Sequence, residues 1–168
     1  MHASLQHKER PHTQLELYAP VDGEVLELSQ VEDPVFSQQM MGEGVAIHYS
    51  GGDVYAPIAG RMASLFMPSC HAFILESPEG VQILVHVGLD TVKLPAGILQ
   101  ALCHEGDEVK RGQKILHVDE ARLRVYGYQL VTPIVVLQSE NVLAVHRCLD
   151  AGSPSQAGKA LLARCDLV

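Results

Sequence analysis

Glycine and proline divide the sequence into short apolar runs, and this division most limits the folds open to the chain. The 168 residues include 14 Gly and 9 Pro, spread along the chain rather than pooled in one linker. Runs rich in Val, Ile and Leu, separated by turn residues at intervals of about 8 to 12 residues, are typical of β-sandwiches and barrels. Examples are EVLEL, GVAIHY, AFILE, VQILVHV, KILHV and TPIVVL. The pattern predicts an all-β fold, an antiparallel sandwich or barrel, in which only residues 94–106 and 119–130 have room for short helical turns.

One short motif occurs twice. Residues 19–23 read APVDG and residues 56–60 read APIAG, 37 residues later, and each motif leads into an apolar run. Proline can begin a strand where no ladder donor is needed, and glycine permits a sharp bend. A related turn-rich stretch, residues 105–112, precedes the run KILHV. These echoes predict a duplicated motif within one sandwich.

Composition narrows the class of protein. Residues 1–15 lack an apolar segment, so we expect a flexible tail there and a single domain over residues 16–168. Apolar residues make up 47% of the chain and charged residues 19%, which disfavours disorder. Twelve Lys and Arg against twenty Asp and Glu give a net charge of −8, which disfavours nucleic-acid binding. No apolar run is long enough to span a bilayer. We therefore expect a cytoplasmic protein.

Four cysteines lie far apart, without a C-x-x-C pair: Cys70, Cys103, Cys148 and Cys165. In a chain without a secretion signal, widely spaced cysteines are most simply reduced thiols. We expect buried free thiols rather than disulfides or a zinc site.

Two of the nine histidines stand in a relation that can be worked out. The segment from His71 reads HAFILE, then SPEG, then VQILVHV up to Val87, which is typical of a β-hairpin. A loop of two or four residues would pair Glu76 with Val81, and therefore His71 with His86. The same register would place Phe73 opposite Leu84 and Ile74 opposite Ile83; a loop of three or five residues would break it.

Adjacent imidazoles in an apolar surface have three interpretations: a structural pair, two metal ligands, or a nucleophile and its helper. In the third case, neutral His86 could attack a phosphoryl group while His71 donates a hydrogen bond. The hydroxyl of Ser69 could supply another donor. Gly88 would leave room for a partner, and Asp90 could orient His86 or cap the strand end.

Two stretches around the histidines form recognisable motifs. Residues 84–92 read LVHVGLDTV and residues 70–73 read CHAF. They resemble the phosphorylation-site motif and the second-histidine motif of the glucose-type enzyme IIA proteins of the bacterial phosphoenolpyruvate-dependent sugar phosphotransferase system. Further stretches follow in the family's order: APVDGEVLEL, DPVF, GEGVAI, APIAG and EGDEVKRGQ. The resemblance runs from residue 18 to 137 and more loosely to residue 162.

This resemblance implies a β-sandwich with a duplicated motif that acts as a phosphoryl relay. His86 would accept the phosphoryl group on Nε2 from the phosphohistidine of the carrier protein HPr. It would pass the group to a cysteine of an enzyme IIB domain, which phosphorylates sugar during membrane transport. His71 would stabilise the phosphoryl group and assist its transfer. No cofactor would be required, and the phosphorylation state would also regulate partner enzymes or transporters.

The resemblance also implies a surface for docking partners. Phe36, Met67 and Leu84 match an apolar rim around the histidines, and Asp33 and Asp90 match acidic residues near the site. Neither flank resembles an enzyme IIB or IIC domain, so we expect a free-standing protein.

Other chemistries remain open on the sequence alone. His86 and Asp90 fit the H-x-x-x-D half of the ligand set in lysostaphin-like zinc hydrolases, although the H-x-H motif of those enzymes is missing from this sequence. Zinc could also bind to His71 and His86 at a partner interface, completed by a partner's carboxylate. A biotinyl or lipoyl carrier would need an exposed lysine between methionines, a setting that Lys110 lacks.

Overall fold

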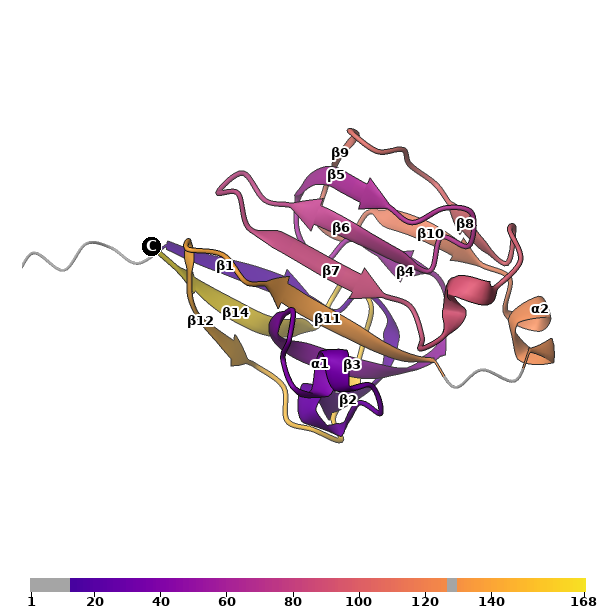
Figure 1. Ribbon diagram of the computed structural model, residues 1–168, viewed down its shortest axis with the longest axis horizontal. Helices are drawn as coiled ribbons and strands as arrows, with labels where there is room; N and C mark the ends of the chain where they lie inside the picture. The colour runs from indigo at the N-terminus through magenta and orange to yellow at the C-terminus, as the bar shows by residue number, and fades with distance from the viewer. Residues whose placement is uncertain (1–12, 127–129) are drawn as a thin grey trace, which may run out of the picture.

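The computed structural model describes residues 13–126 and 130–168 (Figure 1). Its helices are short: α1 (Pro34–Ser37), α2 (Glu120–Val125) and the 3-10 helices η1 (Leu28–Gln30) and η2 (Thr91–Lys93). The strands are β1 (Thr13–Tyr18), β2 (Asp22–Glu27), β3 (Gly42–Gly51), β4 (Val54–Tyr55), β5 (Gly60–Leu65), β6 (Ala72–Glu76), β7 (Gln82–His86), β8 (Leu99–Ala101), β9 (Glu108–Val109), β10 (Lys114–Val118), β11 (Val131–Leu137), β12 (Val142–Arg147), β13 (Pro154–Ser155) and β14 (Leu161–Leu167).

The strands form antiparallel sheets, which confirms the all-β prediction. The largest sheet has the order β13-β2-β3-β11-β7-β6-β5-β9, and two smaller sheets have the orders β1-β14-β12 and β4-β10-β8. The main core includes residues of the large sheet, such as Ile47 and Phe73, together with Leu116 and Leu162 of the smaller ones. A second, smaller cluster joins Ala72, Leu84 and Val135 of the large sheet to residues of η1 and α1. The α1 segment therefore covers part of this sheet and lies next to β3 in Figure 1, and its Phe36 contacts His86 at the end of β7.

The repeated motif is a true structural duplication. Tyr18 N–H donates to Pro57 O at 2.9 Å, and Tyr55 N–H donates to Pro20 O at 2.8 Å, so the two motifs bind each other in the same way. The edge strands repeat this relation, because β13 pairs with β2 as β9 pairs with β5. The turn-rich stretch before β10 therefore has a counterpart before β14.

The shared glycine of the two motifs has a steric cause. A Cβ at Gly23 would lie 2.0 Å from His48 O, and one at Gly60 would lie 2.1 Å from Glu76 O. In each copy the neighbouring strand passes so close that no side chain fits. Glycine at this point allows each repeat to pair with the next strand.

The hairpin register differs by one residue from the expected one. Ser77 N–H donates to Val81 O at 2.8 Å and Val81 N–H donates to Ser77 Oγ at 3.1 Å, so the loop closes on this pair. Consequently His86 lies opposite Ala72, Phe73 opposite Val85, Ile74 opposite Leu84 and Leu75 opposite Ile83. The prediction that His71 lies directly opposite His86 is therefore wrong.

Three local expectations can also be compared with the structure. Helix α2 lies within residues 119–130, as predicted, with residues 127–129 outside the described part. The prediction of helix in residues 94–106 is wrong, since this stretch forms β8 and turns, whereas α1 was not anticipated. Residues 13–15, expected in the tail, pair with β14, and residues 1–12 are not described.

The four cysteines are free thiols, as expected, although Cys148 is only half-buried. Within residues 13–126 and 130–168, no helix is long and apolar enough to cross a membrane.

Candidate functional site

The two histidines lie side by side despite the shifted register. His86 ends β7, and His71 immediately precedes β6, where its carbonyl accepts a hydrogen bond from Val87 N–H at 2.6 Å. Successive side chains of a regular strand point to opposite faces of the sheet. Because Ala72 pairs with His86, a regular strand would put the His71 side chain on the other face from His86. Because Cys70 has a left-handed backbone, with φ of 56°, the chain turns just before His71. The two ring centroids are 5.0 Å apart with an interplanar angle of 77°.

A backbone carbonyl determines which nitrogen of His86 is reactive. His86 Nδ1 lies 2.6 Å from Gly88 O. A carbonyl oxygen only accepts hydrogen bonds, so Nδ1 carries the proton and donates it. In the neutral ring, Nε2 then carries the free lone pair. The local chain therefore selects the tautomer that leaves the Nε2 lone pair free.

Gly88 adopts φ of 76°, which directs its carbonyl toward His86. A Cβ at this position would lie 2.6 Å from both Leu130 Cδ2 and Thr91 Cγ2. Sequence reasoning expected Gly88 to leave room for a partner; the structure shows that its missing side chain leaves room for these two buried neighbours.

We expect Gly88→Ala to lower the free energy of unfolding by about 1 to 3 kcal/mol more than a control at positive φ, the scale of overpacking, because its Cβ overlaps Leu130 and Thr91, and to slow phosphoryl acceptance. Urea unfolding and a phosphorylation time course would measure both effects. Gly106→Ala is a matched control, because Gly106 has φ of 89° but a Cβ added there would meet no heavy atom within 4 Å. Equal losses in the two variants would contradict a specific role for Gly88.

His71 is held by a buried hydroxyl. Ser69 Oγ and His71 Nδ1 are hydrogen-bonded at 2.5 Å, and both residues are buried. The Ser69 hydroxyl thus lies at the site, where it binds the His71 imidazole. This contact fixes the His71 ring so that Nε2 remains available to the site.

Aromatic rings flank the pair on both sides. The Phe36 ring lies 5.3 Å from that of His86, and the Phe66 ring lies 5.9 Å from that of His71, between centroids. Sequence reasoning missed Phe66. Its position directly after the end of β5 and five residues before His71 was the available signal.

The surroundings of both imidazoles favour their neutral forms. Burial lowers the pKa of His71, and the neighbouring His86 lowers it further. Burial also lowers the pKa of His86, against the opposing effects of the Gly88 hydrogen bond and of Asp33 and Asp90. The neutral form, in which one ring nitrogen keeps a free lone pair, is therefore favoured at both rings.

The acidic residues act on His86 at a distance. Asp33 caps α1, because its Oδ1 accepts a hydrogen bond from Val35 N–H at 3.0 Å. Asp90 has a left-handed backbone and is the N-cap residue before η2, and its charge, like that of Asp33, raises the pKa of His86. Since Gly88 O occupies Nδ1, the Gly88 carbonyl rather than Asp90 orients the ring.

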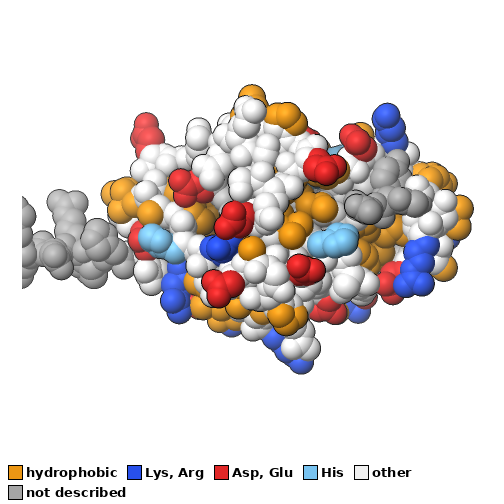
Figure 2. Space-filling view, turned by 90° about the horizontal axis from the view of Figure 1, so that it is seen from below, with side chains coloured by type: hydrophobic (Ala, Val, Ile, Leu, Met, Phe, Trp, Pro, Cys, Tyr) orange, Lys and Arg blue, Asp and Glu red, His pale blue; other side chains and the backbone are white. Residues whose placement is uncertain are grey.

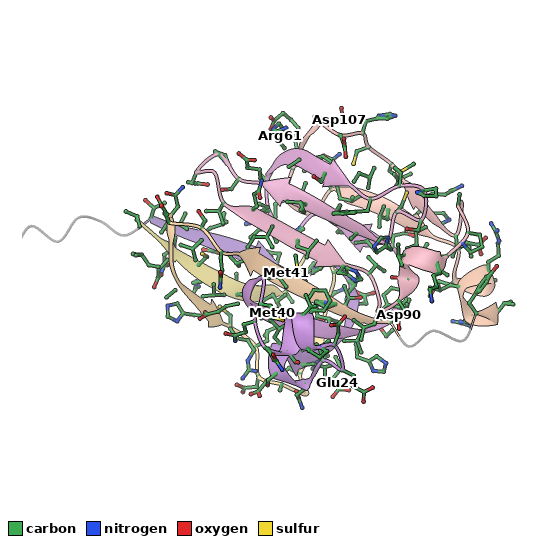
Figure 3. All side chains as sticks on the ribbon, viewed as in Figure 1. Glu24, Met40, Met41, Arg61, Asp90 and Asp107 are labelled. Carbon is green, nitrogen blue, oxygen red and sulfur yellow. The ribbon has the colours of Figure 1, made fainter. Side chains whose placement is uncertain are left out.

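The expected rim residues differ in exposure. Met67 is 67% exposed, whereas Phe36 and Leu84 are only 5% and 3% exposed and belong to the small core cluster. The exposed apolar side chains near them include Phe66 at 42% and Met40 at 63%. Figure 3 shows Met40 and Met41 beside α1, and Figure 2 shows hydrophobic and acidic side chains interspersed on one face of the molecule.

Metal ligands are sparse around the histidines. Among the described residues, no group of three or more His, Cys, Asp and Glu side chains could hold a metal ion. His86 and Asp90 therefore lack the third ligand that the zinc-hydrolase alternative needs. His71 and His86 could contribute two ligands to a site completed by a partner.

Comparisons with known proteins identify the family. A family described as "phosphoenolpyruvate-dependent sugar phosphotransferase system, EIIA 1" matches residues 15–142. The chain is 39% identical over 138 residues to the glucose-specific EIIA component of Oceanobacillus iheyensis, covering 82% of this chain and 83% of the relative. It is 36% identical over 138 residues to the glucose-specific EIIA component of Haemophilus influenzae, covering 82% of each.

A longer relative and a solved structure agree with this match. The glucoside-specific EIICBA component of Staphylococcus carnosus is 38% identical, and the alignment covers 87% of this chain but 21% of that protein. The fold is similar to glucose permease IIA from Mycoplasma capricolum, with a TM-score of 0.77, 30% identity, and coverage of 90% of this chain and 96% of the other. The chain therefore belongs to the EIIA family of the phosphoenolpyruvate-dependent sugar phosphotransferase system, and its function is that of a phosphoryl carrier in sugar uptake.

Proposed function

We propose that His86 carries the phosphoryl group on Nε2, receiving it from the phosphohistidine of HPr and passing it to a cysteine of an enzyme IIB domain. One observation carries the assignment: His86 Nδ1 donates to Gly88 O at 2.6 Å and leaves the Nε2 lone pair free. The adjacent His71 ring, 5.0 Å away, supplies the second group that the transfer requires.

The chemical step needs no proton transfer at His86. The Nε2 lone pair attacks phosphorus, the new N–P bond forms, and the electron pair of the donor's N–P bond returns to the donor imidazole. The Nδ1 proton stays on its hydrogen bond to Gly88 O, so the phosphorylated ring is cationic. Asp33 and Asp90 raise the pKa of His86 against the effect of burial, and the same charges would favour this cation.

The second half-reaction, in which His86 gives the phosphoryl group to the IIB domain, depends on the same two histidines. A cysteine thiolate of the IIB domain attacks phosphorus, the N–P bond breaks, and its electron pair returns to Nε2. A cationic ring is a good leaving group because it departs as neutral imidazole. Phosphoryl transfer depends mainly on positioning and on donors to the equatorial oxygens. With the Ser69 hydroxyl donating to Nδ1, the proton of the neutral His71 ring would be on Nε2, and His71 would supply such a donor through Nε2–H.

The name of a relative and the exposed apolar side chains near the histidines indicate which partners this chain would bind. The Staphylococcus carnosus relative is named an EIICBA component, which supports an EIIB-type acceptor for this chain. We expect HPr and IIB to dock on the exposed apolar side chains around the histidines, such as Met67. A phosphoryl group adds about −1.5 to −2 charges to that face, so the phosphorylation state would also control binding to regulated enzymes or transporters. These partners would place the protein in the cytoplasm.

Mapping the phosphoryl group tests this assignment. The protein would be labelled with ¹⁵N-histidine and incubated with phosphoenolpyruvate, enzyme I and HPr. We expect one acid-labile phosphoryl group, with phosphorus–nitrogen coupling to His86 Nε2 in NMR spectra. His104→Gln is a suitable control, since the His104 side chain is 95% exposed outside the site, and it should be labelled normally. Coupling to His86 Nδ1, or to another histidine, would refute the proposal.

A further inference from the structure

The carbonyl that orients His86 belongs to a turn. Gly88 lies in residues 87–90, between the end of β7 at His86 and the start of η2 at Thr91. Glycine adopts a wider range of backbone angles than any other residue. The direction of the Gly88 carbonyl, and with it the hydrogen bond from His86 Nδ1, must therefore be fixed by contacts between this turn and other residues.

The hydroxyl of Thr91 makes one of these contacts. Thr91 Oγ1 donates a hydrogen bond to Val87 O at 2.5 Å, and Thr91 is fully buried. The Val87 carbonyl and the Gly88 N–H belong to one peptide unit, which is planar. A hydrogen bond to the Val87 carbonyl therefore fixes the plane from which the chain continues to the Gly88 carbonyl.

The methyl group of Thr91 packs against the same turn. A Cβ added at Gly88 would lie 2.6 Å from Thr91 Cγ2, so the methyl group occupies the space where another residue would carry its side chain. Thr91 thus contacts both residues on which the direction of the carbonyl depends, Val87 through its hydroxyl and Gly88 through its methyl group.

The backbone on the other side of Val87 is bound to the second histidine. Val87 N–H donates to His71 O at 2.6 Å. Val87 is therefore held on both of its peptide units, by His71 on one side and by Thr91 on the other. The His71 contact uses a backbone carbonyl, whereas the Thr91 contact uses a side chain and can be removed by substitution.

Two observations separate this contact from other roles of a threonine at the start of a helix. The N-cap residue of η2 is Asp90, and the Thr91 hydroxyl binds the turn before the helix. Thr91 is 0% exposed, so its side chain cannot touch a phosphoryl group that enters from the surface. Any effect of Thr91 on the reaction must pass through the turn.

We propose that Thr91 is a positioning residue for phosphoryl transfer, whose hydroxyl holds the Gly88 carbonyl in the direction that keeps the proton of neutral His86 on Nδ1. The hydrogen bond made by one ring nitrogen decides which nitrogen is protonated. Without the Thr91 hydroxyl, the turn is free to move the carbonyl away, and the proton can then occupy Nε2. The consequence for transfer rests on the proposed function, in which the Nε2 lone pair attacks phosphorus.

Two substitutions at Thr91 separate its hydroxyl from its methyl group. Thr91→Val removes the hydroxyl and keeps nearly the same shape, whereas Thr91→Ser keeps the hydroxyl and removes the methyl group. The full chains would be labelled with ¹⁵N-histidine, and the nitrogen chemical shifts of the neutral His86 ring would be measured. We expect the unmodified chain to show protonated Nδ1 and unprotonated Nε2. In Thr91→Val the two shifts should move toward each other, because exchange averages the two tautomers.

The rate of phosphoryl acceptance from HPr is the second measurement. In Thr91→Val it should fall by about 10- to 100-fold, since misplacement of a reacting group by about 1 Å costs about 100-fold. Thr91→Ser should retain the Nδ1-protonated tautomer and most of the rate. If Thr91→Val does not fold, Thr91→Ala takes its place in the same comparison, because it removes the same hydroxyl from a smaller side chain.

Ser155→Ala is a matched control, because it removes a buried hydroxyl that donates to the backbone carbonyl of Val21 at 3.2 Å. Ser155 lies in β13, which β2, β3 and β11 separate from β7 in the large sheet. This variant should show the shifts and the rate of the unmodified chain.

The outcomes distinguish this inference from the relay itself. Unchanged His86 shifts in Thr91→Val overturn the proposal, as do changed shifts with an unchanged rate of acceptance. Equal effects in Thr91→Ser or in Ser155→Ala also overturn it, because the hydroxyl of Thr91 would then have no specific role. If the unmodified chain accepts no phosphoryl group, the proposed function fails, while the nitrogen shifts still report whether Thr91 selects the tautomer.

Discussion

His86→Ala is expected to reduce phosphoryl acceptance from phosphorylated HPr by at least about 1,000-fold, the scale of loss when a nucleophile is removed. The variant lacks the imidazole whose Nε2 lone pair is left free by the hydrogen bond from Nδ1 to Gly88 O. The His86 ring packs against Phe36 and His71, so its removal opens a gap at the edge of the site without touching the main core. Initial rates of labelling would measure the loss.

Two controls would show that the loss of labelling comes from the missing imidazole and not from misfolding of the variant. A thermal unfolding transition close to that of the unmodified chain would show that the variant folds. His104→Gln, altered at an exposed histidine, should be labelled at the normal rate. Residual labelling of His86→Ala at His71 or elsewhere, at more than a trace, would show that the roles of the two histidines are wrongly assigned.

His71→Gln is expected to slow the two half-reactions to different extents. Acceptance on His86 should fall by less than about tenfold, since the nucleophile and its Gly88 hydrogen bond remain. Onward transfer to a IIB domain should fall by about 100-fold, because the variant loses a donor held in place by Ser69, a loss comparable with removing one oxyanion donor. Single-turnover rates of each half-reaction, measured separately, would show the split.

Comparing the rates of the two half-reactions in His71→Gln identifies the role of His71. If His71→Gln abolishes both half-reactions equally, His71 is either the acceptor or a structural residue, and the map of the phosphorylated nitrogen decides between them. Because His71 is buried and bonded to Ser69, the stability of the variant must be compared with that of the unmodified chain. If the two rates are unchanged, the helper role is excluded.

The strand-rich fold could be predicted because it depends on local features, and the two candidate histidines were singled out by short motifs, although the register expected to bring them together was wrong. Alternation of short apolar runs with glycine and proline indicates antiparallel strands, and the repeated motif at residues 19–23 and 56–60 indicates a duplication. The hairpin register could not be predicted. It depends on whether Glu76 or Ser77 pairs with Val81, and the Ser77 hydroxyl, which binds Val81 N–H, favours the second.

The surface around the site was predicted less well, for a related reason. Phe36 and Leu84 match rim positions in sequence, but they pack with Ala72 and Val135 in the cluster under α1. Burial depends on residues from several strands, and α1 is only four residues long, too short to give a helical period. Phe66 carries no motif and was found only through its ring contact with His71.

By itself, the sequence determined the strand-rich fold and the duplication, and its motifs singled out the two histidines, since periodicity and motifs are properties of neighbouring residues. The tertiary structure decided which nitrogen of His86 is free, because the answer depends on the direction of the Gly88 carbonyl at a positive φ. Contacts across the sheets and backbone angles in turns are set by the packing of the whole domain, and no local pattern encodes them.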